Sequence, residues 1–123
     1  MARMLIIDDD ENFRELLRLM LEQAGYEVVD ACNGREGLSR YRAAPTDVVI
    51  VDLFMPEQEG LETIQALRRE CPTVKIIAVS GGDRTGTLDL LPIAARLGAQ
   101  RTLRKPLRLR ELCDAVQAML GTR

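Results

Sequence analysis

The chain has 123 residues, enough for one domain of ordinary size, and its 46% apolar and 29% charged residues indicate a globular protein with a hydrophobic core. The formal net charge of −2 argues against binding of nucleic acid or anionic membranes through an overall positive field, and no apolar run is long enough to span a membrane. The absence of histidine excludes Ser-His-Asp and Cys-His nucleophile systems and His-ligated zinc.

The hydrophobic pattern predicts five strands that alternate with five helices along the chain. We expect strands at 4–8, 26–31, 48–51, 76–79 and 101–104. We expect helices at 12–24, 34–44, 59–70, from about 92 to 98, and 107–120. This alternation predicts an α/β fold in which helices cover both faces of a parallel sheet.

Two further expectations concern burial. The first helix should place one apolar stripe on the core, made of Phe13, Leu16, Leu17, Met20 and Ala24. The three cysteines are odd in number and far apart, which argues against a disulfide framework or a zinc cage. We therefore expect buried, reduced thiols at Cys32, Cys71 and Cys113 and a cytoplasmic location.

Polar side chains follow four of the five predicted strands. Asp8 and Asp9 come after the first strand, Asp52 after the third, Ser80 after the fourth and Lys105 after the fifth. Ligands of an open parallel sheet bind at the carboxyl ends of its strands, where the strand order reverses. With the flavodoxin-like order 2-1-3-4-5, the three aspartates would meet in one pocket.

Three carboxylates in one pocket need a partner. Two like charges about 4 Å apart repel by on the order of 4 kcal/mol at an effective dielectric near 20. Oxygen ligands without His or Cys suit Mg²⁺, which is commonly shared between carboxylates and a phosphate. Lys105 and Ser80 could stabilise phosphoryl oxygens, and Asp52, alone at the end of a central strand, is best placed as a nucleophile.

Single residues among these also have less specific interpretations. Asp10 and Glu11 are more typical of a loop or a helix cap, and Ser80 alone would be an ordinary turn residue. Lys105 is more informative, because the chain has only two lysines among its 17 basic residues. The basic C-terminal stretch, residues 96–123, is most simply a solvated surface, and docking of a partner is the alternative.

Taken together, these residues resemble the receiver domain of two-component response regulators. The resemblance covers nearly the whole chain and rests on four motifs: the acidic run 8–10 after an apolar strand, the segment 52–56 (DLFMP), Ser80-Gly81 and Lys105-Pro106. It implies one receiver domain over residues 1–123 without an output domain, a five-stranded 2-1-3-4-5 sheet, and Mg²⁺-dependent phosphoryl transfer from a histidine kinase or phosphotransfer protein. It implies a signalling phosphoacceptor rather than a turnover enzyme, with self-catalysed phosphorylation and dephosphorylation possible.

The resemblance also implies roles for single residues. Asp52 would be the phosphoacceptor, and Ser80 and Lys105 would bind phosphoryl oxygens. Asp9 would be a direct Mg²⁺ ligand together with Asp52 and the main-chain carbonyl of Phe54, while Asp8 would act through water. The Lys105-Pro106 bond resembles the family's cis peptide. The output would be a change in binding of an unidentified downstream protein, without direct nucleic-acid or membrane contact.

The sequence departs from the family pattern in strand five, and two alternative functions are open. The strand-five position at which the family often has an aromatic switch residue is Thr102, so switching would use another residue. A small haloacid-dehalogenase-like phosphatase would use Asp8 as nucleophile, and its phosphatase activity would be lost in Asp8→Asn but not in Asp52→Asn. A receiver-fold binding module that signals without phosphate is the other alternative.

Overall fold

The computed structural model describes residues 2–53, 55, 59–81 and 90–121. Its strands are β1 (Arg3–Ile7), β2 (Glu27–Ala31), β3 (Val48–Asp52), β4 (Ile76–Ser80) and β5 (Arg101–Arg104). Its helices are α1 (Glu11–Gln23), α2 (Gly34–Ala43), α3 (Glu59–Glu70), α4 (Leu91–Leu97) and α5 (Leu109–Leu120). Each predicted strand and helix is present, with bounds that differ by at most two residues.

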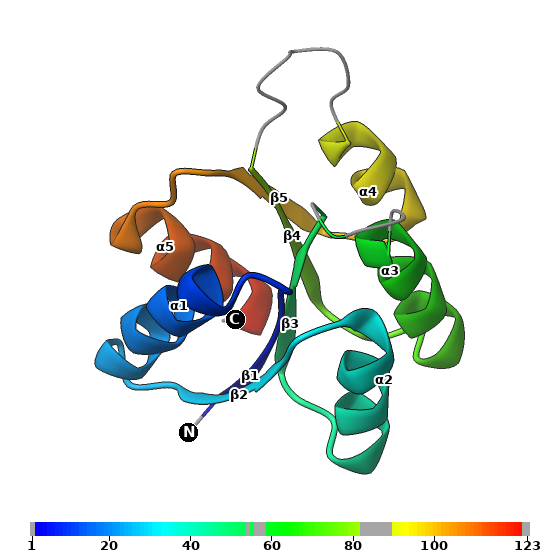
Figure 1. Ribbon diagram of the computed structural model, residues 1–123, viewed down its shortest axis with the longest axis horizontal. Helices are drawn as coiled ribbons and strands as arrows, with labels where there is room; N and C mark the ends of the chain where they lie inside the picture. The colour runs from blue at the N-terminus through cyan, green and yellow to red at the C-terminus, as the bar shows by residue number, and fades with distance from the viewer. Residues whose placement is uncertain (1, 54, 56–58, 82–89, 122–123) are drawn as a thin grey trace.

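The five strands form one parallel sheet in the order β2-β1-β3-β4-β5 (Figure 1). All residues of β3 and β4 are buried, as expected of strands covered on both faces, whereas β5 is mostly exposed. The position of β5 at the edge explains why its sequence, Arg-Thr-Leu-Arg, is a weak strand pattern. The predicted α/β class and strand order are confirmed.

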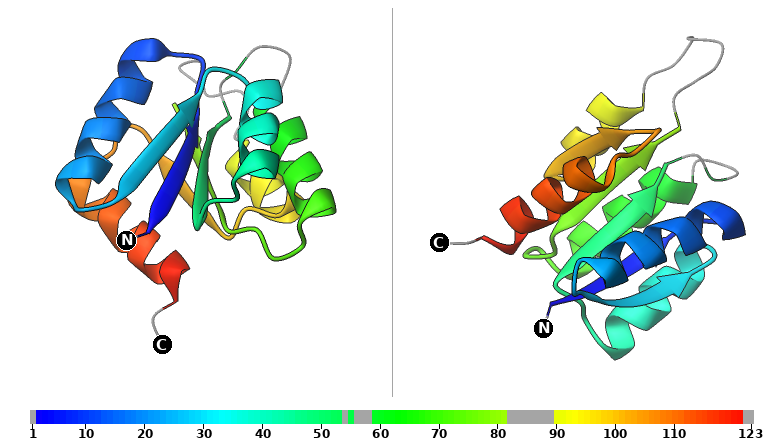
Figure 2. Two further views of the ribbon diagram at one scale, coloured as in Figure 1. Left: turned by 90° about the horizontal axis from the view of Figure 1, so that it is seen from below. Right: turned by 90° about the vertical axis from the view of Figure 1, so that its left-hand side faces the viewer.

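Helices cover the sheet on both sides (Figures 1 and 2). Helices α1 and α5 pack on one face, where the core includes Leu17, Leu21, Leu112 and Val116. Helices α2, α3 and α4 pack on the other face, where the core includes Tyr41, Ile64, Leu67 and Leu91. The sheet is thus packed on both faces, and both cores contribute to the positions of the strand ends.

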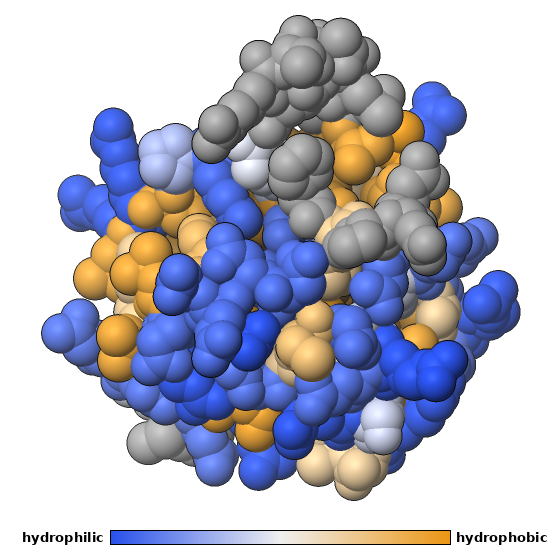
Figure 3. Space-filling model, in the orientation of Figure 1, coloured by the Kyte–Doolittle hydropathy of each residue, from blue (hydrophilic) through white to orange (hydrophobic). Residues whose placement is uncertain are grey.

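Two burial predictions were wrong in part. Leu16 is 50% exposed and Ala24 is also exposed, while Leu21, which the predicted stripe omitted, is fully buried. Leu16 lies about 100° around the helix from the buried Leu17, which carries its side chain off the core face. Apolar surface is accordingly visible on the α1–α5 side and over α4 (Figure 3).

The cysteine prediction also needs correction. All three thiols are free, as expected, but Cys32 is exposed, and Cys71 and Cys113 are only partly buried. Cys32 follows the edge strand β2 directly and precedes Asn33, the N-cap of α2, so it lies in a surface turn. None of the described helices is long and apolar enough to cross a membrane.

Candidate functional site: an acidic cluster beside a lysine

The sheet register brings four strand ends to one edge. The pairing of β1 with β3 sets Asp8 beside Asp52, each at or just after the end of its strand. The pairing of β4 with β5 sets Ser80 opposite Arg104, one residue before Lys105. Because these strands are parallel and adjacent, side chains that are far apart in the sequence lie side by side.

Asp8, Asp9 and Asp52 form a cluster in which one carboxylate oxygen of each lies within 4.8 Å of the others. Asp8 and Asp52 are buried, with 0% and 3% of their surface exposed, and Asp9 is exposed. The predicted convergence of the three aspartates is therefore present in the structure. Such a set of oxygen atoms, open to solvent on the Asp9 side, has the chemistry of a hard divalent cation site.

The Asp8 carboxyl group is held in an unfavourable environment for a charge. One oxygen, Oδ1, accepts a hydrogen bond from the Asp10 N–H at 2.8 Å, but the buried Oδ2 has no hydrogen-bond partner among the described residues. Burial raises the pKa of Asp8 from 3.8 to about 7; the Asp10 N–H opposes this and the Asp52 charge adds to it. Asp8 is thus a group that gains from a nearby cation.

The first turn of α1 and the Arg14 side chain fix the segment that carries the acidic pair. The Asp10 carboxylate caps α1 by accepting hydrogen bonds from the N–H groups of Asn12 and Phe13, as expected for a cap residue. Arg14 donates to the main-chain oxygen of Asp8 at 2.7 Å and also pairs with Asp30 of β2. The turn after β1 is therefore tied both to α1 and to β2.

Lys105 lies on the other side of Asp52. Its Nζ is 3.6 Å from Asp52 Oδ1, and its main-chain N–H donates a hydrogen bond to the main-chain oxygen of Ser80 at 2.8 Å. The Lys105-Pro106 peptide bond is cis, as the resemblance implied. Ser80, whose side chain carries a hydroxyl group, is buried, with 7% of its surface exposed. The structure thus places an ammonium group against the central carboxylate, and the adjacent strand β4 ends in a buried serine.

Gly60 allows α3 to approach the end of β3 closely. A Cβ atom at this position would lie 2.5 Å from the Asp52 main-chain oxygen and 2.8 Å from Leu53 Cα. Both neighbours are backbone atoms, so a side chain could be accommodated only if the helix moved away from the strand. A glycine in the first turn of a predicted helix was a usable sequence signal for close packing here.

We therefore expect Gly60→Ala to destabilise the protein. The clash should outweigh the better helix propensity of alanine and lower the free energy of unfolding by about 1–2 kcal/mol. Urea unfolding followed by circular dichroism measures this, with Glu62→Ala, at an exposed site of the same turn, as the control. A Gly60→Ala protein as stable as the control would contradict the packing argument.

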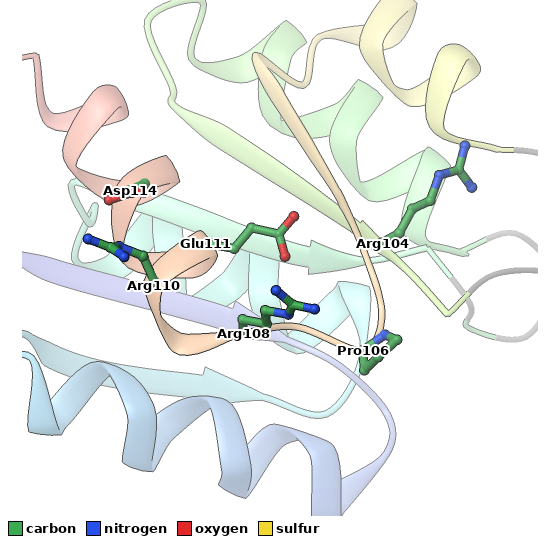
Figure 4. A pocket seen from close by; sticks show the side chains of 6 residues that line it. All are labelled: Arg104, Pro106, Arg108, Arg110, Glu111 and Asp114. Atoms are coloured by element: carbon green, nitrogen blue, oxygen red, sulfur yellow. The ribbon is translucent and has the colours of Figure 1, made fainter.

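Two surface hollows among the described residues border β5. One of about 560 Å³ is lined by residues from the end of β5, the following turn and α5: Arg104, Pro106, Arg108, Arg110, Glu111 and Asp114 (Figure 4). Another, of about 400 Å³, lies between α4 and β5 and includes Thr102. Thr102 is exposed, and none of the β5 residues is aromatic.

The structure brings together Asp8, Asp9, Asp52 and Lys105, with Ser80 at the end of the neighbouring strand. Phe54, whose main-chain carbonyl was the remaining expected metal ligand, lies outside the described residues. Sequence reasoning missed Phe13, which it assigned only to the core: the Lys105 Nζ lies 3.7 Å from the centroid of its ring.

Comparison with known proteins agrees with this geometry. A family model described as response regulator receiver domain matches residues 4–117. The chemotaxis protein CheY of Thermotoga maritima is 33% identical over 115 residues, which cover 93% of this chain and 93% of that protein. A probable transcriptional regulatory protein of Picosynechococcus is 34% identical over 97% of this chain but only 49% of its own length. The chain thus spans about half the length of several curated regulators that it matches.

Solved structures show the same fold. A receiver domain protein from Clostridium thermocellum has a TM-score of 0.88 and 30% identity, covering 98% of this chain and 94% of that one. The response regulator TrrA from Thermotoga maritima, solved in complex with Mg²⁺-BeF, has a TM-score of 0.83 and 33% identity, covering 97% of this chain and 99% of that one. Both similarities extend over nearly the full length of each chain.

Proposed function

The chain belongs to the family of response regulator receiver domains, which are the phosphoacceptors of two-component signalling, and we propose that Asp52 is its phosphoacceptor. The observation that carries this proposal is the position of the Asp52 carboxylate. It lies between the acidic pair that follows β1 and the ammonium group of Lys105. A haloacid-dehalogenase-like phosphatase, with Asp8 as nucleophile, would leave this central position without a role.

We propose Mg²⁺ as the cation of the acidic cluster, held by Asp8, Asp9 and Asp52 together with the main-chain carbonyl of Phe54. The oxygen-only ligand set and the unpartnered, buried Oδ2 of Asp8 fit such an ion. When bound, Mg²⁺ supplies positive charge that offsets the repulsion among the carboxylates and stabilises the oxygens of a transferring phosphoryl group.

The chain's own residues have separate tasks in the transfer. The Asp52 carboxylate forms the new O–P bond while the N–P bond of a phosphohistidine breaks and the imidazole leaves. Lys105, already 3.6 Å from Asp52 Oδ1, pairs with a phosphoryl oxygen that gains charge. The Ser80 hydroxyl group donates a hydrogen bond to another phosphoryl oxygen. The proposed donor is a histidine kinase or phosphotransfer protein, as for receiver domains in general.

The output follows from the added charge. By analogy with other phosphorylated residues, the group brings roughly −1.5 to −2 charge units, which draws Ser80 and Lys105 toward Asp52. Ser80 ends β4 and Lys105 directly follows β5, so the surface near β5 and α5 changes its preferred conformation. The result is a shift in the binding of a downstream protein rather than a turnover reaction.

Titration with beryllofluoride, a mimic of an acyl phosphate, tests this function. Isothermal calorimetry with Mg²⁺ present should show saturable binding at one site, and binding should be lost when EDTA removes the cation, because the negatively charged mimic would then face the aspartates alone. Asp114→Asn, on an exposed part of α5, is the control and should bind like the unmodified protein. Absence of binding with Mg²⁺ would favour the phosphate-independent binding module instead.

A further inference from the structure

The Lys105 ammonium group has two close partners, one aromatic and one anionic. Its Nζ lies 3.7 Å from the centroid of the Phe13 ring and 3.6 Å from Asp52 Oδ1. The lysine side chain is 21% exposed, so it has enough contact with solvent to leave Asp52 if nothing restrained it. The contact with the phenyl ring favours the one conformation of this long, flexible side chain that keeps Nζ close to Asp52.

A cation over the face of an aromatic ring is attracted by the ring quadrupole, and the attraction is larger where water is partly excluded. Phe13 is itself half-buried and packs against the core between the sheet and helices α1 and α5. The ring is therefore a fixed partner, while the four-carbon stem of lysine is the mobile one. The contact restricts the lysine rather than the phenylalanine.

The ring is also anchored to the acidic cluster through the backbone. The Phe13 N–H donates to the Asp10 carboxylate at 3.3 Å, and the Asp10 N–H donates to Asp8 Oδ1 at 2.8 Å. Together with the Phe13–Lys105 and Lys105–Asp52 contacts, these bonds form a continuous series from Asp8 to Asp52. A displacement of the first turn of α1 would move the ring and the acidic segment together.

We infer that Phe13 is a positioning residue, whose ring holds the Lys105 ammonium group beside Asp52 before a phosphoryl group arrives. This inference rests on the proposed function of Asp52 and Lys105 and adds a residue that does not touch the phosphoryl group. Its aromatic face, rather than its bulk alone, performs the task. An aliphatic residue of similar size would fill the core but leave the lysine free to sample solvent.

Lysine-selective NMR of the free protein tests the contact directly. The chain has only two lysines, so Lys105 gives one of two Hε–Cε signals, and Lys75→Arg identifies it by removing the other. Protons above an aromatic face are shielded, so the Lys105 Hε signal should lie upfield of that of Lys75. Phe13→Leu should abolish the upfield shift and Phe13→Tyr should retain it, with Lys75 unchanged in both.

The effect on the site is measured by the Mg²⁺-beryllofluoride titration described above. Loss of the ring should weaken binding by about threefold to tenfold in Phe13→Leu, whereas Phe13→Tyr, which keeps the aromatic face, should stay within about twofold of the unmodified protein. In a Lys105→Gln background, which has no cation to position, Phe13→Leu should change the affinity by less than about twofold. Circular dichroism establishes that every variant is folded under the titration conditions.

The outcomes separate the two proposals. An equal loss of affinity for Phe13→Leu with and without Lys105 would show a merely structural role for Phe13 and overturn the inference. A Lys105 signal without an upfield shift would also overturn it. If the unmodified protein binds no beryllofluoride, the proposed function fails, and the NMR measurement still decides whether the ring holds the lysine.

Discussion

Replacing Asp52 with asparagine is expected to abolish phosphorylation of the chain. The amide has nearly the same shape as the carboxylate but is a far weaker nucleophile, so the O–P bond cannot form. Incubation with radiolabelled, phosphorylated histidine kinases should label the unmodified protein at one site. With Asp52→Asn the label should stay at the background of a reaction without the chain.

The control for this experiment is Asp10→Asn. Asp10 lies next to the acidic pair and caps α1, and asparagine is an equally good cap, so the fold and the acceptor are both retained. This variant should be labelled. One-site labelling of Asp52→Asn by the same kinase would remove the assignment of the acceptor, and the remaining carboxylates of the cluster would have to be tested in turn.

Asp8→Asn is expected to stabilise the protein at pH 8 in the absence of divalent cations. The pKa of Asp8 is about 7 in the folded chain, raised from 3.8 mainly by burial. The folded state therefore binds the proton more tightly than the unfolded state, and the stability that this gives below pH 4 is lost as the pH rises through 7. At pH 8 the buried charge destabilises the fold, and the neutral amide does not.

The expected gain at pH 8 is on the order of 2 kcal/mol in the free energy of unfolding, and it should be smaller at pH 5, where Asp8 is protonated in the folded state and ionised only in the unfolded state. Urea unfolding in EDTA at both pH values measures it, with Asp114→Asn as an exposed control. Addition of Mg²⁺ should stabilise the unmodified protein more than the variant. Equal destabilisation at both pH values would instead mean that the Asp10–Asp8 hydrogen bond dominates.

The sequence was sufficient for the main part of the fold because its signals are local. Apolar runs without alternation predict strands buried on both faces, and β3 and β4 are such strands. Their polar ends could be assigned to one edge because parallel strands share a direction. Predicting that Asp8, Asp9 and Asp52 converge then required only one further assumption, the strand order. The rules for connections between strands leave few possible orders.

Other features depend on packing that a linear pattern does not contain. Phe13 and Leu16 both fit an apolar stripe, but only the three-dimensional arrangement shows that Phe13 lies beneath Lys105 and that Leu16 faces solvent. Residue type alone predicted that Cys32 is buried, but Cys32 lies in a surface turn and is exposed. The close approach at Gly60 depends on how α3 meets the end of β3.

The position of β5 at the edge of the sheet means that the segments carrying the negative and positive groups of the site differ in local stability. Asp8 and Asp52 follow or end strands in the interior of the sheet, whereas Lys105 follows a strand of four residues paired on one side only. Edge strands of this kind open by fraying at a lower free energy than the global unfolding of the domain. Partial opening would withdraw the Lys105 ammonium group from Asp52 while the three carboxylates stay together, so the proposed capacity of the domain to accept a phosphoryl group would vary without loss of its fold.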